Sequence, residues 1–103
     1  MKHRLKYTVL FLSDLKEIFN YIAQDNPIKA KEFLQKIDDN IQQLESSPRL
    51  GKLVRETDEI LIDDTRRIVY KNYVIYYSVA KQENLIYLER IIHGGRHILL
   101  DNS

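Results

Sequence analysis

The sequence predicts an α+β domain in which a helical hairpin packs on one face of an antiparallel sheet. Apolar residues recur at three- and four-residue spacing over residues 12–22 and 30–44, which is typical of two amphipathic helices. The segments 66–70, 73–79 and 85–92 are dense in isoleucine, valine and tyrosine, which favours strands. The expected order is an N-terminal strand, two helices and an antiparallel meander of three or four strands.

Length and composition support one globular domain over residues 1–103. The chain is 44% hydrophobic and 30% charged, and it contains no cysteine, which excludes disulfides and thiolate metal sites. The start is basic and then apolar, as in a signal peptide, but Ser13 and Asp14 follow at once and no small-residue cleavage site appears. No apolar run approaches the ~20 residues of a membrane helix. We therefore expect a cytoplasmic protein.

The first two elements are predicted from alternation and then from helical spacing. Residues 3–10 combine β-branched and aromatic residues in rough alternation, which predicts a strand. Asp14 with Glu17 three residues later resembles a capping box, so the first helix should begin there and end near Asp25. Its apolar face consists of Leu12, Leu15, Ile18, Phe19 and Ile22.

The second helix has clear signals at both ends. Asn26 is a good N-cap, and Pro27 suits the first helical position because its missing N–H costs nothing there. Ser46, Ser47 and Pro48 end the helix. Its apolar stripe consists of Ala30, Phe33, Leu34, Ile37, Ile41 and Leu44. Two helices with almost no linker should form an antiparallel hairpin whose stripes are buried on the sheet.

The C-terminal part reads as strands joined by short turns. Lys71-Asn72 lies between two strand-like segments, which is consistent with a tight hairpin, and residues 81–84 form a second turn. A turn-rich crossover at 47–59 joins the helices to these strands. Tyrosines on such strands are more often packing residues than stacking platforms. They are Tyr70, Tyr73, Tyr76, Tyr77 and Tyr87.

Arginines of the strands are the candidates for binding an anionic partner. Residues 66–103 carry six Lys/Arg against three Asp/Glu. Because adjacent strand residues point to opposite faces, one of Arg66 and Arg67 should lie on the open sheet face and the other toward the helices or a rim. Guanidinium groups of neighbouring strands that converge on the open face suit phosphate or carboxylate. The alternative is pairing with Asp63, Asp64, Glu83 or Glu89.

The histidines near the end of the last strand have two interpretations. Imidazole titrates near neutrality, so His93 suits acid–base chemistry, but it more simply binds backbone and fixes the strand end. His93 and His97 are four residues apart, which suits a metal only on a helix, and a Gly-Gly pair separates them here. We expect no metal and no cofactor. The sequence also lacks P-loop, GxSxG and HExxH motifs.

Three segments together resemble the RelE/ParE superfamily of toxins. They are "SPRLG" after the helical hairpin, "RRIVYKNYVIYYSV", and "IIHGGRH", whose His-Gly-X-Arg ending is more similar to the ParE branch. The resemblance spans nearly the whole chain. It implies the toxin component of a type II toxin–antitoxin module, used in plasmid stabilisation and neutralised by a cognate antitoxin.

The branches of this superfamily imply different activities. ParE-like members bind DNA gyrase without nuclease activity, whereas RelE-like members are mRNA endoribonucleases that act on or off the ribosome. A third possibility is a non-toxic relic that still binds its antitoxin. Arg66 or Arg67 and Arg96 match the arginine positions of the nucleases, but no tyrosine follows Arg96. Arg49, Lys52 and Arg55 match the lysines of the nucleases only loosely. We therefore favour gyrase inhibition.

Each hypothesis assigns residues to a site. For gyrase binding they are Arg66, Arg67, Arg90, His93 and Arg96. For RNA cleavage Arg66, Arg67 and Arg96 would hold phosphate, with His93 or His97 in acid–base roles. The antitoxin is expected to cover apolar surface near Leu12, Phe19, Phe33 or Ile41, or to add a strand at the edge of the first strand.

Overall fold

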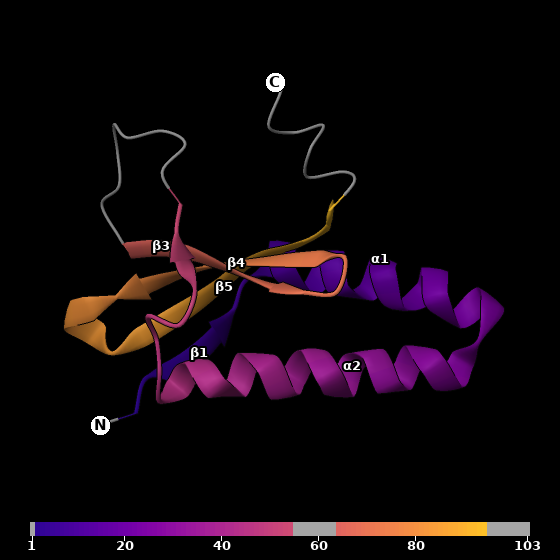
Figure 1. Cartoon of the computed structure of the whole chain (residues 1–103), viewed down its shortest axis with the longest axis horizontal. Coiled ribbons are helices and arrows are strands. Elements are labelled where there is room, and N and C mark those ends of the chain that lie inside the picture. Colours follow the sequence, from indigo (N-terminus) through magenta and orange to yellow (C-terminus); the bar gives the residue numbers. More distant parts are fainter. Residues whose placement is uncertain (1, 55–63, 95–103) are drawn as a thin grey trace, which may run out of the picture.

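The computed structural model describes residues 2–54 and 64–94, and it confirms the predicted α+β class (Figure 1). The strands are β1 (Arg4–Tyr7), β2 (Lys52–Leu53), β3 (Asp64–Tyr70), β4 (Tyr73–Ala80) and β5 (Leu85–His93). The helices are α1 (Val9–Asp25) and α2 (Pro27–Gln42), with short 3-10 turns at Gln43–Glu45 and Lys81–Glu83.

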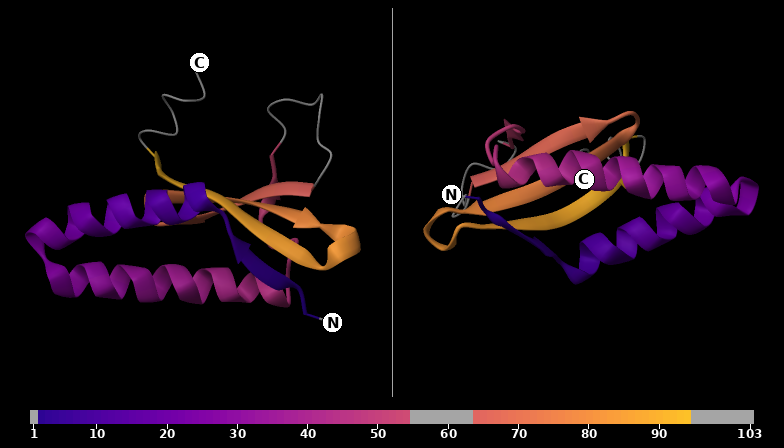
Figure 2. Two further views of the ribbon diagram at one scale, coloured as in Figure 1. Left: turned by 180° about the vertical axis from the view of Figure 1, so that it is seen from behind. Right: turned by 90° about the horizontal axis from the view of Figure 1, so that it is seen from below.

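The five strands form one sheet in the order β1-β5-β4-β3-β2. The predicted antiparallel meander is confirmed for β3, β4 and β5. β1 pairs in parallel with β5, so the whole sheet is mixed, which the sequence pattern did not reveal. Figures 1 and 2 show the two long helices running side by side as a hairpin that extends past the end of the sheet.

The start of α1 differs from the prediction. The first strand ends at Tyr7, and Val9 is already helical, because Thr8 is the N-cap and its Oγ1 accepts a hydrogen bond from the Phe11 N–H at 3.1 Å. Asp14 therefore lies inside the helix and does not form the expected capping box. Its carboxylate binds β5 instead.

The turn between the helices is as predicted. The Asn26 N–H donates to the Ile22 carbonyl at 2.9 Å, and its Oδ1 accepts from the Lys29 N–H at 3.1 Å. One residue thus ends α1 and begins α2, which explains how the two helices reverse direction with almost no linker. Pro27 is the first residue of α2.

The core lies between the helices and one face of the sheet. Phe11 of α1 and the α2 stripe are buried against the central strands β4 and β5. The fully buried side chains include Ile37, Ile41, Leu44, Ile75, Tyr77, Val79, Ile86, Leu88 and Ile91. This packing leaves the other sheet face free of α1 and α2. Within the described residues no helix is long and apolar enough to span a membrane.

Candidate functional site

Strand pairing decides which of the two adjacent arginines faces the core. Arg66 is opposite Tyr77 and Arg67 is opposite Tyr76, and directly paired residues share a sheet face. Tyr77 is fully buried on the helix side. Arg66 therefore lies on the helix-covered face and Arg67 on the opposite face, which is called the open face below. The sequence predicted this split but not its direction.

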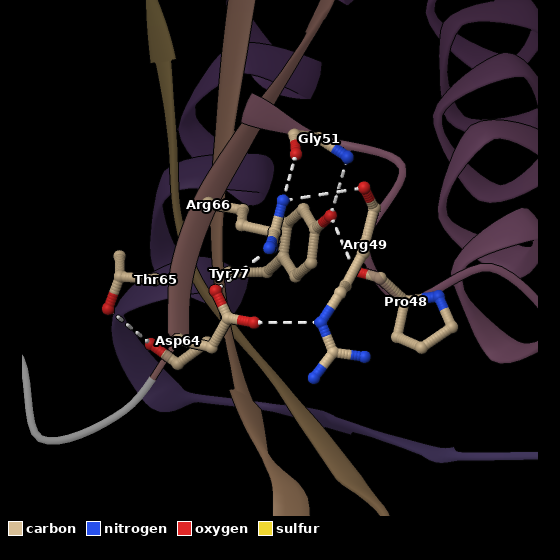
Figure 3. A network of polar contacts seen from close by, with 8 residues as sticks. Pro48, Arg49, Gly51, Asp64, Thr65, Arg66 and Tyr77 are labelled. Atoms are coloured by element: carbon tan, nitrogen blue, oxygen red, sulfur yellow. Dashed lines mark hydrogen bonds and ion pairs between the residues drawn. The ribbon is translucent and has the colours of Figure 1, made fainter. Parts of the chain in front are cut away.

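Arg66 is held in a polar network at the edge of the core (Figure 3). Its Nε donates to Asp64 at 2.9 Å and its Nη1 donates to the Gly51 carbonyl at 2.8 Å. Asp64 also contacts Arg49 Nε at 3.4 Å. Only 13% of the Arg66 side chain is exposed. The predicted pairing of an arginine with Asp64 thus holds for Arg66, and this side chain fastens the segment before β2 to β3.

Tyr77 completes the same network. Its hydroxyl accepts from the Gly51 N–H and donates to the Pro48 carbonyl, both at 2.8 Å. Burial is the main reason why the pKa of Tyr77 is raised. A Cβ at Gly51 would lie 2.5 Å from the Arg67 carbonyl oxygen, so only glycine fits here. The network therefore places the neighbouring Lys52 beside Arg67.

Arg90 lies on β5 and is tied to α1. Its Nε and Nη2 donate to the two carboxylate oxygens of Asp14 at 2.7 and 2.9 Å, and this hydrogen bonding raises the pKa of Arg90. Arg90 is opposite Tyr76, at a bulge in the β4–β5 pairing. Its side chain remains 41% exposed, so it can contact a partner, but Asp14 offsets its charge.

His93 lies at the end of β5, directly opposite Tyr73. Its ring makes an edge contact with the Tyr73 ring at a centroid distance of 5.3 Å. Tyr73 in turn packs on Phe33 of α2 at 4.9 Å. His93 therefore belongs to the helix-covered face, across the sheet from Arg67. This placement favours its structural interpretation over an acid–base role beside Arg67.

Two predicted site residues, Arg96 and His97, lie outside the described residues, as does Arg55 of the crossover. For residues 2–54 and 64–94, no group of three His, Asp or Glu side chains could hold a metal ion.

The open face carries a row of residues that the sequence did not bring together. Lys52 is opposite Arg67, Arg67 is opposite Tyr76, and Tyr76 is opposite Arg90, so the row crosses β2, β3, β4 and β5. A two-residue strand such as β2 has no period to detect, so the sequence places Lys52 only in the crossover. Lys6 on β1 is opposite Tyr87 and adds a cation to the same face.

The four residues expected near the antitoxin fall into two groups. Phe33 and Ile41 are 8% and 1% exposed and pack in the core, so their side chains are not presented to a partner. Leu12 is 50% exposed on α1, close to Val9 at 83%, and Phe19 is partly exposed. Of these four residues, only Leu12 and Phe19 on α1 are therefore accessible to a partner.

The matched family and the known structures identify the class of protein. The family model for the ParE toxin of the type II toxin–antitoxin system, parDE, matches residues 5–98. The chain belongs to the ParE toxin family. This ParE toxin is accordingly the toxin component of a type II toxin–antitoxin module, and its partner is a cognate antitoxin. No curated protein sequence matches it significantly.

Solved structures share the fold of this ParE toxin at low sequence identity. The chromosomal ParDE system from P. aeruginosa has a TM-score of 0.68 at 21% identity, covering 89% of this chain and 96% of that one. The RelBE2 toxin–antitoxin complex from Mycobacterium tuberculosis has a TM-score of 0.61 at 16% identity, covering 90% of this chain and 99% of that one. A metal-bound toxin from Helicobacter pylori has a TM-score of 0.56 at 18% identity, covering 91% of this chain and 97% of that one.

Proposed function

We propose that this ParE toxin arrests growth in the cytoplasm by binding DNA gyrase and stabilising its DNA-cleaved state. The observation that carries the proposal is the position of Arg67, a cation on the open face that no described carboxylate neutralises. Arg90 is in the same row of paired residues and is 41% exposed, but its guanidinium binds Asp14 of α1, so Arg67 carries the proposal. Arg66 lies on the other face and holds the segment before β2 through its hydrogen bond to the Gly51 carbonyl.

The geometry of the described residues supports a binding mechanism over RNA cleavage. Cleavage needs a base and an acid beside the phosphate-binding cations. His93 is separated from Arg67 by the sheet itself, since it shares a face with Tyr73 and the core. An inhibitor that only binds needs no such pair.

Gyrase supercoiling with purified components tests the proposal. The toxin should block supercoiling and increase cleaved DNA while leaving added RNA intact. Normal supercoiling at a large excess of toxin would refute it. The non-toxic relic is tested in the same strain by expression without antitoxin, where continued growth would support that alternative.

An mRNA endoribonuclease is the second candidate, and one observation favours it. Lys52 and Arg67 are directly opposed on the open face, so two cations flank one position where a phosphate would bind. Mapping mRNA ends after brief expression separates the two functions. Codon-positioned cuts that disappear in Arg67→Ala and Arg96→Ala variants would support cleavage, and intact transcripts during growth arrest would exclude it.

The antitoxin is proposed to dock on the first half of α1. Val9, Leu10 and Leu12 are all at least half exposed there, and large exposed apolar side chains that lie together mark interaction surfaces. An amphipathic antitoxin segment would cover them.

A further inference from the structure

The two sides of the toxin differ sharply in charge. The helices α1 and α2 carry four lysines and no arginine against six Asp/Glu. On the open face, strand pairing brings together Arg4, Lys6, Lys52, Arg67 and Arg90. Arg90 differs from the others because its guanidinium is bound by Asp14 of α1. Among the described residues, the open face therefore carries more positive charge than the helices.

Lys52 and Arg67 place two positive charges directly opposite each other on this face. Like charges directly opposite each other in an antiparallel pair are destabilising. Neither Lys52 nor Arg67 forms an ion pair with a carboxylate of the described residues. The network of Arg66, Asp64 and Tyr77 nevertheless fixes Gly51 and so holds Lys52 in this position. A bound anion would relieve the repulsion.

Two tyrosines lie between these cations. Tyr76 on β4 and Tyr87 on β5 are in neighbouring rows, because Tyr87 is opposite Ser78, two residues beyond Tyr76. Both are partly exposed, and neither belongs to the core cluster. Aromatic rings on adjacent central strands of a sheet are the arrangement on which unpaired bases stack, while flanking cations follow the phosphate backbone.

We propose that the open face binds single-stranded DNA directly, with Lys52, Arg67 and Lys6 on phosphates and with Tyr76 and Tyr87 under the bases. The row from Lys52 to Arg90 crosses four strands, about 14 Å at ~4.8 Å per strand, which accommodates a few nucleotides. The inference rests on the proposed function, since a toxin that stabilises the DNA-cleaved state of gyrase would act beside DNA. The toxin would then hold the cleaved state by gripping DNA as well as protein.

Fluorescence anisotropy with a labelled single-stranded DNA of about ten nucleotides tests the inference. Arg67→Gln and Lys52→Gln should each weaken binding and lower the slope of log K against log salt by about 0.7. Lys31→Gln removes one charge from the exposed surface of α2 and should change neither. Tyr87→Leu should weaken binding about ten-fold, whereas Tyr87→Phe should retain it. Circular dichroism confirms that each variant is folded.

Three outcomes would overturn the inference. They are no binding at low salt, an equal loss for the Lys31 variant, or tighter binding of duplex DNA or of RNA of the same sequence. The supercoiling assay separates this failure from failure of the proposed function. If the toxin inhibits gyrase but binds no single-stranded DNA, the proposed function stands and this inference falls.

Discussion

Asp14 of α1 binds Arg90 of β5 through two hydrogen bonds of 2.7 and 2.9 Å, across 76 residues of sequence. The same carboxylate accepts the Ile91 N–H at 3.2 Å. Thr8 binds the backbone of the same strand at Leu88, since its N–H and Oγ1 both donate to the Leu88 carbonyl. The first turns of α1 thus take over the edge of β5 where β1 ends at Tyr7.

Replacement of Asp14 should therefore loosen the attachment of α1. We expect Asp14→Ala to lower the free energy of unfolding by about 2 kcal/mol, because it removes charge-assisted hydrogen bonds and leaves the Ile91 N–H without a partner. Urea denaturation measures the change. Lys16→Ala, an exposed residue of the same helix, should cost far less, and equal losses in both variants would contradict this role of Asp14.

Substitution of Arg66 and of Arg67 should have very different effects on the free energy of unfolding. Arg66→Ala removes the partner of Asp64, a carboxylate whose side chain is 8% exposed, so we expect a loss of about 3 kcal/mol. Arg67→Ala removes a cation that faces Lys52, so stability should stay within about 0.5 kcal/mol or rise slightly. Thermal unfolding of both variants checks the assignment, which fails if Arg67→Ala is the more destabilised protein.

Three tyrosines should make the folded protein less stable at alkaline pH. Burial is the main cause that raises the pKa of Tyr7, Tyr73 and Tyr77 above the ordinary value of 10.0. In the unfolded chain these phenols ionise first, so the unfolded state loses protons that the folded state keeps. Their contribution to stability is thus intact below pH 10.0 and falls as the pH rises through the folded pKa values.

Urea denaturation on both sides of this pH measures the loss, and Tyr77→Phe should reduce it. A spectroscopic titration in which all seven tyrosines of the folded protein ionise together at the ordinary value would contradict the prediction.

Leu12 should contribute to antitoxin binding without contributing much to the fold. It is 50% exposed, so Leu12→Ser should leave unfolding almost unchanged while weakening the complex with the cognate antitoxin about ten-fold or more. Calorimetric titration measures the affinity. Val69→Ser, an equally apolar exposed site on β3, is the control and should bind normally. Unchanged affinity of the Leu12 variant would contradict antitoxin docking on the first half of α1.

The sequence predicted elements better than the contacts between them. Helical spacing and the Asn26-Pro27 pair are local signals, and they located the hairpin correctly. Asp14 also sits in a local capping pattern, but its partner is Arg90 on a distant strand, so the local pattern misplaced the helix start. Thr8 was the true signal, a good N-cap directly before apolar residues.

The site depended on pairing that no local pattern contains. Alternation implied that Arg66 and Arg67 face opposite sides, yet only the pairing with Tyr77 and Tyr76 shows which of them meets the core. The parallel placement of β1 beside β5 is equally long-range, and it brings Lys6 to the open face. Such relationships are set by how the hairpin packs on the sheet.

Gyrase inhibition by matched charge variants tests the central claim most directly. Supercoiling is measured against increasing amounts of wild-type, Arg67→Gln and Lys31→Gln toxin, each first shown to be folded. We expect wild-type and Lys31→Gln toxin to inhibit gyrase equally and Arg67→Gln to need at least about ten-fold more protein, the loss of one charged contact of ~1.4 kcal/mol or more. Equal inhibition by all three proteins, or none by the wild-type toxin, would contradict the account.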